Sequence, residues 1–322
     1  MIKNTFFYAM LFLASFAFVG CSDDPEDTTP QPAATSSNTI VDIARGEDFT
    51  TFAAALERAG LIETLQGEGP FTVFAPTNAA FDALLAELEI EGLDQVSNAQ
   101  LTEILLNHVV SGKVLSTDLT AGYVNTLATG AQDTKISVLV DLTDGVKLNN
   151  RATVTTHNID ADNGVVHVIN NVLTVPSIVD AALANANFSI LVEALTDSRL
   201  ASADFVNTLN GDGPFTVFAP TNAAFQNLLD SNDDWNSLAD IPAATLESVL
   251  KYHVVVGDNV TSGEIVDGLT PTTFEGSTFT INTTNGVVIT DKGGNESTVQ
   301  IADVQTSNGV IHAINRVLLP LE

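Results

Sequence analysis

The chain has 322 residues, of which 45% are apolar, so it is long enough for two domains that each bury a core. Eleven Lys and Arg residues stand against 40 Asp and Glu residues, which gives a net charge of −29 at neutral pH. Such a surface repels phosphate backbones and anionic lipids, which excludes nucleic acid as a partner and leaves a covalent or inserted anchor as the route to a membrane.

The first 20 residues have the pattern of an export signal. Lys3 precedes an apolar run over residues 6–19 that is too short to span a bilayer comfortably. The only cysteine of the chain, Cys21, follows Gly20, and this junction resembles a bacterial lipobox, in which the chain is cut after Gly20 and Cys21 is acylated. The alternative is an ordinary signal peptide with a chance cysteine. The lipobox interpretation predicts stable anchoring in the outer membrane or cell envelope.

Residues 21–38 are predicted to form a disordered acidic tether. They are rich in Asp, Pro, Thr and Ser and have no apolar face, so they cannot bury enough surface to fold. The early acidic residues Asp23, Asp24 and Glu26 resemble a surface-export tag of lipoproteins, although solubility alone would also favour acidic residues here. We therefore expect the protein to be displayed on the cell surface.

From residue 39 onwards the sequence repeats itself. Gly69 to Phe81 reads GPFTVFAPTNAAF, and the same thirteen residues return from Gly213 to Phe225. Three shorter segments also return, namely 40–42 at 178–180, 108–110 at 253–255, and 163–167 at 308–312. A period this long indicates duplicated globular domains, which we place at 39–176 and 177–322.

Helical patterns come first in each repeat and strand patterns later. In chain order, the first repeat is predicted to contain a helix over 49–65, a strand over 71–75 that is buried on both sides, a helix that Thr77-Asn78 can cap, a helix ending near 108, and strands over 136–140, 146–148, 153–157 and 165–175. Asp-Gly and Asn-Gly pairs supply the tight turns between the later strands. This order predicts an α+β fold with an antiparallel sheet or a wedge-shaped sandwich.

The repeated blocks resemble the hallmark segments of the fasciclin domain. They are residues 69–81 and 163–173, with a histidine motif between them, and they recur at 213–225 and 308–318. The family's histidine motif is usually Tyr-His, which Tyr252-His253 matches and Asn107-His108 does not. The resemblance implies two tandem fasciclin domains that act as an extracellular adhesion or ligand-binding module. No integrin function carries over, since residues 45–47 read Arg-Gly-Glu rather than Arg-Gly-Asp.

Four of the five histidines recur in both repeats, His108 with His253 and His167 with His312. They could form a ligand or metal site in each domain, or they could be held in the core by hydrogen bonds, with Asn170 and Asn315 as candidate partners. All four lie in apolar patterns, which favours the structural interpretation. The other motif residues receive the same interpretation: Thr77, Asn78, Thr221, Asn222 and Tyr252.

Other chemistry is weakly represented. Residues 158–164 resemble a calcium loop, but Ile169 stands where the bidentate Glu belongs, so we predict a polar hairpin loop and no metal site. The sequence has no phosphate-binding glycine loop, no His-Glu-x-x-His and no Gly-x-Ser-x-Gly. We therefore predict no enzymatic activity and no cofactor.

The favoured hypothesis is a cell-surface adhesion protein that binds an extracellular protein or polysaccharide and touches the membrane only through its lipid anchor. One alternative is a lipoprotein that captures a glycan or small ligand for uptake, which a deep apolar pocket would favour. A further alternative, a hydrolase, would need a nucleophile and a base that meet in the fold.

Overall fold

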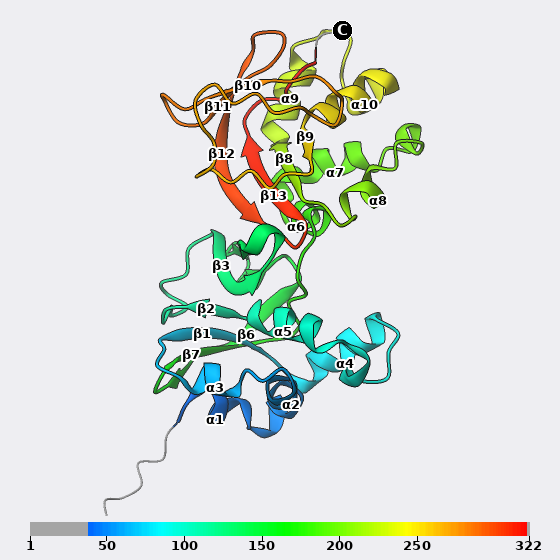
Figure 1. The fold of residues 1–322 in the computed structure, drawn as a ribbon. Helices are drawn as coiled ribbons and strands as arrows, with labels where there is room; N and C mark the ends of the chain where they lie inside the picture. The colour runs from blue at the N-terminus through cyan, green and yellow to red at the C-terminus, as the bar shows by residue number, and fades with distance from the viewer. Residues whose placement is uncertain (1–37, 321–322) are drawn as a thin grey trace, which may run out of the picture. The chain divides into compact units, whose positions relative to one another are not determined.

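The structure is a computed structural model that describes residues 38–320. The predicted signal peptide, the acylation of Cys21 after Gly20 and the tether up to residue 37 lie outside the described residues. Residues 38–320 contain two copies of one arrangement, in which most helices precede most strands (Figure 1). We call residues 38–176 the first repeat and residues 177–320 the second repeat.

The first repeat begins with helices that polar side chains cap. Thr39 accepts from the backbone N–H of Asp42 in a capping box at the start of the first helix, and Ser97 does the same with Gln100 at a later one. The elements in chain order are α1 (Ile40–Ala44), α2 (Thr50–Arg58), α3 (Ile62–Gln66), β1 (Phe71–Pro76), α4 (Asn78–Glu87), α5 (Asn98–Leu106), β2 (Val109–Ser111), β3 (Gly122–Thr129), β4 (Lys135–Asp141), β5 (Lys147–Leu148), β6 (Ala152–Ala161) and β7 (Gly164–Ile169).

The second repeat follows the same plan with fewer strands. A capping box between Ser177 and Asp180 starts its first helix, as Thr39 and Asp42 do in the first repeat. Its elements are α6 (Ile178–Ala184), α7 (Ser189–Leu195), α8 (Phe205–Leu209), β8 (Phe215–Pro220), α9 (Asn222–Asp230), α10 (Ala243–Tyr252), β9 (Val254–Val256), β10 (Thr280–Asn282), β11 (Val288–Thr290), β12 (Glu296–Gln305) and β13 (Gly309–Ile314).

The prediction of one continuous helix over 49–65 is wrong, because the structure has two helices there. Helix α2 ends at Arg58, and α3 starts only at Ile62. Gly60 takes a positive φ of 71°, and the backbone N–H of Leu61 reaches back to the carbonyl of Leu56 at 2.9 Å. This is a glycine-terminated helix end, so the chain turns here although the apolar spacing continues.

The α+β class is confirmed, but the sheets are mixed rather than antiparallel. The strand order is β2-β1-β7-β6-β5-β4-β3 in the first repeat and β10-β11-β12-β13-β8-β9 in the second. Strand β1 runs parallel to β7, and β8 runs parallel to β13, while the other neighbours pair antiparallel. A parallel pair needs a long crossover, and the many elements between β1 and β7 provide it.

Strand β1 lies between two apolar clusters, which explains its almost unbroken apolar sequence. Val73 and Ala75 pack with the helical residues, including Phe52 and Phe81. Phe74 points to the opposite side and packs with residues of β4, β5 and β6. Side chains alternate across a strand, so a strand buried on both faces is apolar throughout.

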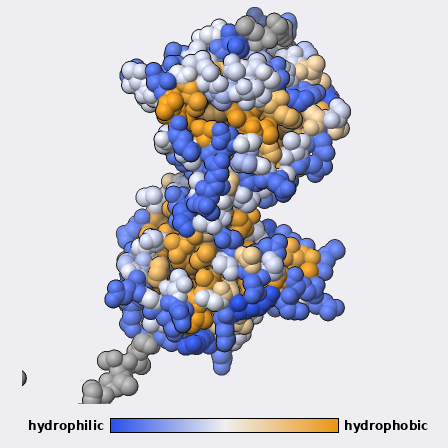
Figure 2. Space-filling model, in the orientation of Figure 1, coloured by the Kyte–Doolittle hydropathy of each residue, from blue (hydrophilic) through white to orange (hydrophobic). Residues whose placement is uncertain are grey.

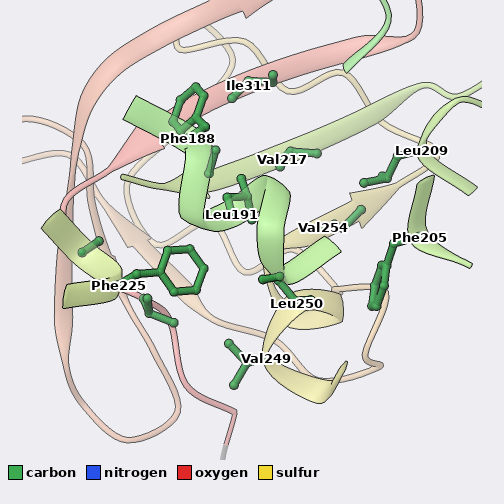
Figure 3. Close-up of a cluster of buried hydrophobic side chains, with 14 of the residues drawn as sticks. Phe188, Leu191, Phe205, Leu209, Val217, Phe225, Val249, Leu250, Val254 and Ile311 are labelled. Carbon is green, nitrogen blue, oxygen red and sulfur yellow. The ribbon is translucent and has the colours of Figure 1, made fainter. Parts of the chain in front are cut away.

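The second repeat has the same two cores. Figure 3 shows the helix-side core, to which Leu191 of α7, Leu250 of α10 and Val217 of β8 all contribute buried side chains. The other core contains Phe218, Tyr252 and residues from β10 and β11. The two faces of the central parallel pair are therefore covered by different elements, helices on one side and strands and loops on the other.

Hydrogen bonds also connect residues of the two repeats. The Tyr123 hydroxyl accepts from the side-chain amide of Asn185 at 2.9 Å. The Gln305 backbone N–H donates to the Ser137 hydroxyl at 3.1 Å, and the Thr134 hydroxyl donates to the Gln305 side chain at 2.8 Å. Burial raises the pKa of Tyr123, so its phenol stays protonated in this contact.

Among residues 38–320, no single helix has the length and apolar composition that crossing a membrane requires. One bent pair, Ile178–Ala184 with Ala186–Leu195, meets those limits when the two helices are counted together, with a bend of 104° between them.

Candidate functional site

The repeated Thr-Asn pair ends the central strand and begins the next helix. The hydroxyl of Thr77 accepts from the backbone N–H of Ala80 at 3.3 Å, which makes it the N-cap of α4, and Thr221 caps α9 in the same way. Asn78 instead serves a distant helix, because its side-chain oxygen accepts from the backbone N–H of Thr51 at 2.9 Å.

Asn222 makes the matching contacts in the second repeat. Its side-chain oxygen accepts from the backbone N–H of Ile190 at 2.9 Å, and its amide donates to the Ala186 carbonyl at 2.9 Å. Asn78 likewise donates to the carbonyl of Glu47 at 2.9 Å. Each asparagine therefore joins the start of one helix to the start of another.

His108 lies one residue after the C-cap of α5, where it joins the helix to the last segment of the first repeat. Its Nδ1 is 2.7 Å from the Ile104 carbonyl, so Nδ1 carries the proton, and its Nε2 accepts from the backbone N–H of Leu173 at 2.9 Å. His253 repeats both contacts, with the Val249 carbonyl at 2.7 Å and the Leu318 N–H at 2.9 Å.

His167 and His312 each form hydrogen bonds to a loop and to a bulged strand, which is β6 in the first repeat and β12 in the second. The Nε2 of His167 donates to the Val114 carbonyl at 3.0 Å, and its Nδ1 accepts from the backbone N–H of Asn158 at 3.3 Å. His312 makes the same pair of bonds, to the Val260 carbonyl at 2.8 Å and from the Asp303 N–H at 3.3 Å. The residue that donates has a positive φ in both cases, 60° and 61°.

Burial determines the protonation of these imidazoles. His108 and His253 are 0% and 2% exposed, and burial lowers the pKa of each to about 4. Burial also lowers the pKa of His167 and His312. Each ring is neutral at pH 7 and already has a partner for both nitrogens, so none of the four offers a lone pair to a metal ion or a substrate.

The departure from Tyr-His in the first repeat has a structural consequence. Tyr252 is fully buried, donates to the Thr278 carbonyl at 2.9 Å and packs edge-on against Phe279, and burial raises its pKa to about 12. Asn107 in the matching place donates to the Thr174 carbonyl at 3.0 Å and accepts from the Thr126 hydroxyl at 3.2 Å. In the first repeat, hydrogen bonds from Asn107 to β3 and to the segment between β7 and α6, which we call the connector, therefore replace the packing of Tyr252 against Phe279.

Two repeated residue pairs that sequence analysis did not single out make contacts of the same kind. The Thr72 hydroxyl donates to the Gly112 carbonyl at 2.7 Å and accepts from the Val114 N–H at 2.9 Å, and Thr216 does the same with Asp258 and Val260. The signal that could have found Thr72 and Thr216 is their place inside the identical block.

Asn163 and Asn308 form the second such pair. The side-chain oxygen of Asn163 accepts from the backbone N–H of Ile40 at 3.0 Å, and its amide donates to the Leu65 and Gly67 carbonyls at 2.7 and 3.2 Å. Asn308 bonds Ile178, Leu209 and Gly211 in the same way. Each asparagine ties the first helix of its repeat to the segment before the central strand.

The prediction that Asn170 and Asn315 bind the histidines is wrong. The side-chain oxygen of Asn170 accepts from the backbone N–H of Thr153 at 2.7 Å, and that of Asn315 accepts from Thr298 at 2.8 Å. Both asparagines follow the last strand of their repeat and bond the neighbouring strand directly. The histidines find their partners on the loops and helix ends beside them.

The segment that resembles a calcium loop directs its oxygens to different neighbours. Asn158 accepts from the backbone N–H of Ser116 at 2.8 Å, Asp160 pairs with Lys113, and Asp162 accepts from the backbone N–H of Asn38 at 2.8 Å. Asn38 is the last residue of the predicted tether, so the chain is already bound to the domain there. Within residues 38–320, no group of three His, Cys, Asp or Glu side chains is placed to hold a metal ion.

Replacing Asn163 by alanine is expected to lower the free energy of unfolding by about 2–4 kcal/mol, since it leaves one N–H and two carbonyls of the backbone without their partner. Urea denaturation followed by circular dichroism measures this change. Asn98→Ala is the matched control, because Asn98 is exposed on the first turn of α5. An Asn163 variant as stable as this control would contradict the role given to the side chain.

Comparison with known proteins identifies the repeats. The model of the fasciclin domain matches residues 47–176 and again residues 186–320. The chain belongs to the fasciclin family. The hydrogen-bonded threonines, asparagines and histidines described above are therefore shared features of two fasciclin domains in one chain.

Relatives of this fasciclin protein occur in animals and in bacteria. Human periostin is 32% identical over 280 residues, which cover 84% of this chain and 31% of periostin. The cell surface glycolipoprotein MPB83 of Mycobacterium bovis is 34% identical over 140 residues, which cover 44% of this chain and 59% of MPB83. The chain thus spans about a third of periostin and less than two thirds of MPB83.

A solved structure shares the fold. The fasciclin domain pair of the insect cell adhesion molecule Fasciclin I matches with a TM-score of 0.52 and 20% sequence identity, over 84% of this chain and 97% of that one. At this identity the likeness concerns the fold, which is the tandem arrangement of α+β domains with a mixed sheet in each.

Proposed function

We propose that this protein is an exported adhesion protein, anchored in the outer membrane or cell envelope through acylated Cys21, whose two fasciclin domains bind an extracellular protein or polysaccharide. The two matches to the fasciclin domain carry the proposal, because proteins of this family are generally non-enzymatic adhesion proteins. Similarity to a cell surface glycolipoprotein supports the location, and the lipobox-like junction supports the anchor.

The chemistry of the repeated residues supports binding rather than catalysis. The side chains that recur in both domains hold helix starts, loops and strand ends, and their polar atoms are used within the fold. A nucleophile needs a neighbouring base with a free lone pair, and the four repeated imidazoles have both nitrogens engaged. Binding would then use the outer surface of the domains, which carries the large negative charge.

Replacing Cys21 by serine is expected to release the protein from the membrane fraction and abolish its labelling by a radioactive or clickable fatty acid. The reason is that serine has no thiol for the acyl chain, and the acidic surface does not bind an anionic bilayer by itself. Fractionation and fatty-acid labelling of expressing cells measure the two effects. Ser22→Ala is the control, and equal labelling of the Cys21 variant would contradict the anchor.

Deleting the gene and restoring it tests adhesion itself. Attachment of cells to matrix protein and to polysaccharide surfaces should fall in the deletion strain and return with the intact chain. A deletion strain that attaches, aggregates and forms biofilm as the parent does would contradict the adhesive function, whatever the state of the anchor.

A further inference from the structure

The first fasciclin domain has an open apolar groove between α4, α5 and the connector to the second repeat. Its volume is about 650 Å³, and its apolar wall includes Leu84, Leu88, Ile90, Val96, Ile104 and Val175. The polar side chains of Gln95, Gln100, Glu103, Thr129 and Thr174 also line it, together with Ser307 of the second repeat. Leu88 is 47% exposed and lies beside the other apolar side chains of the groove, so it belongs to an apolar patch. Figure 2 shows apolar residues at the surface in the region that Figure 1 labels α4, with hydrophilic residues next to them.

Carboxylates without partners flank this groove in the sequence. Residues 87–94 read ELEIEGLD, so Leu88 and Ile90 stand between acidic residues. Glu87 pairs with Arg151, whereas Glu89, Glu91 and Asp94 are exposed and have no recorded hydrogen bond or ion pair among the described residues. The nearby guanidinium of Arg58 does not pair with these carboxylates, because it donates to the carbonyls of Leu93 and Val96.

The second domain differs at the corresponding place, where a smaller hollow of about 380 Å³ lies against Leu228 and Leu319, the counterparts of Leu84 and Thr174. Counting from the identical blocks, Asn232 stands where the first domain has Leu88, and Val249 stands where it has Ile104. Val249 is only 3% exposed, and Trp235 and Leu319 pack against the cluster to which it belongs. The two domains share the hydrogen-bond network but differ in the size and lining of the hollow at this surface.

We propose that this groove binds a basic amphipathic helical segment of an extracellular protein. The apolar floor matches leucine-like side chains spaced one helical turn apart, and the free carboxylates match lysines or arginines beside them. A glycan fits less well, because most of the exposed wall is apolar and glycan hydroxyls would lose water against it. The inference rests on the proposed adhesive function and names the class of its partner.

A designed peptide tests the proposal. The probe is a fluorescent helical peptide of leucine and lysine with leucines at positions i, i+3, i+4 and i+7, titrated into the mature chain carrying Cys21→Ser and followed by anisotropy. Two comparison peptides replace every lysine by glutamate or every leucine by serine. The leucine–lysine peptide should bind saturably, and both comparison peptides should bind at least about tenfold more weakly.

Matched variants locate the binding. Leu88→Ser should weaken binding of the peptide about fivefold to tenfold. Leu183→Ser, at a similarly exposed leucine on α6 (55% exposed), should leave the affinity unchanged. Glu91→Lys should weaken it about threefold at low salt and less at high salt, whereas Glu68→Lys on another exposed loop should have little effect. Thermal melting of each variant establishes that all of them are folded.

The outcomes separate this inference from the adhesive function. Two results would contradict the proposed groove: equal affinity of the peptide for the wild-type chain and Leu88→Ser, or equal affinity of the wild-type chain for the leucine-free peptide. Either would mean that the peptide binds only through charge to the acidic surface. Saturable binding that is lost with Leu88→Ser supports the groove. If cells expressing Leu88→Ser attach normally while the deletion strain does not, adhesion stands and the groove is not its binding surface.

Discussion

Lowering the pH from 7 to 4.5 is expected to reduce the free energy of unfolding by several kcal/mol, mainly through the buried histidines. His108 and His253 have a folded-state pKa of about 4, against about 6.5 for a histidine in the unfolded chain. Burial also lowers the pKa of His167 and His312. The unfolded chain therefore binds protons in a pH range in which the folded chain does not.

The sign of the effect follows from this difference. At a pH well above 6.5 neither state binds a proton at these rings, and their contribution to stability is fully present. As the pH falls towards 4, each histidine costs up to about 1.4 kcal/mol per pH unit, because protons stabilise only the unfolded chain. Between pH 7 and 4.5, His108 and His253 each contribute a loss of about 2 kcal/mol.

Geometry explains why the folded rings resist protonation. Each of the four uses one nitrogen as a donor to a carbonyl and the other as an acceptor from a backbone N–H. A second proton would place one N–H against another N–H in a buried site, which removes a hydrogen bond and adds an unpaired charge. The fold would have to open locally before these rings could take up a proton.

Urea denaturation at half-unit pH steps between 7.5 and 4.5 measures how steeply the free energy of unfolding falls with pH. The His253→Gln variant should show a smaller dependence on pH. His157→Gln, at an exposed position of β6, is the control. Histidine NMR signals give a check that does not depend on the variants folding, since the rings of His108 and His253 should not titrate between pH 7 and 5.5 and those of His167 and His312 should have lowered midpoints. Protonation of carboxylates with lowered pKa, such as Asp197 and Asp240, destabilises the fold only near pH 4 and below. The pH range of the histidine effect therefore differs from that of the carboxylates. Four rings with ordinary midpoints would show this account to be wrong.

Replacing Gly164 by alanine is expected to destabilise the first domain by about 4 kcal/mol or more. A Cβ atom at this position would lie 2.0 Å from the Phe71 carbonyl oxygen and 2.9 Å from the Ile40 side chain. Gly164 pairs with Phe71 at the start of the parallel β1–β7 contact, in the centre of the sheet. The backbone must move apart to admit a methyl group, and the ladder and both cores depend on that spacing.

Gly263→Ala is the matched control for this prediction. Gly263 has no positive φ, and a Cβ there would meet only the Thr261 hydroxyl at 3.9 Å, so the change should be small. Chemical denaturation of both variants gives the comparison, and the yield of folded protein gives a second readout if the Gly164 variant fails to fold. A Gly164 variant within 1 kcal/mol of the control would show that β1 and β7 are not held as closely as described.

The local pattern of the sequence predicted many elements well. The apolar run 71–75 became the buried strand β1, and the β-branched segment 136–140 became part of β4. The last predicted strand, 165–175, was too long, because β7 ends at Ile169 and the backbone of Leu173 is bound by His108 instead of a strand. A strand and a segment that bonds to a side chain can have the same apolar sequence, so only the partner distinguishes them.

The sequence by itself determined that one α+β domain occurs twice, that it belongs with the fasciclin domains, and that the central strand is buried on both faces. These conclusions rest on identity between the copies and on the local period of apolar residues, which neighbouring residues alone set. The tertiary structure decided the parallel pairing of β1 with β7, the reach of Asn78 to Thr51, and the position of the apolar groove beside α4 and α5. Each of these depends on which distant segments meet, and the spacing of residues along a chain does not specify the partner of a strand edge, an amide or an exposed leucine.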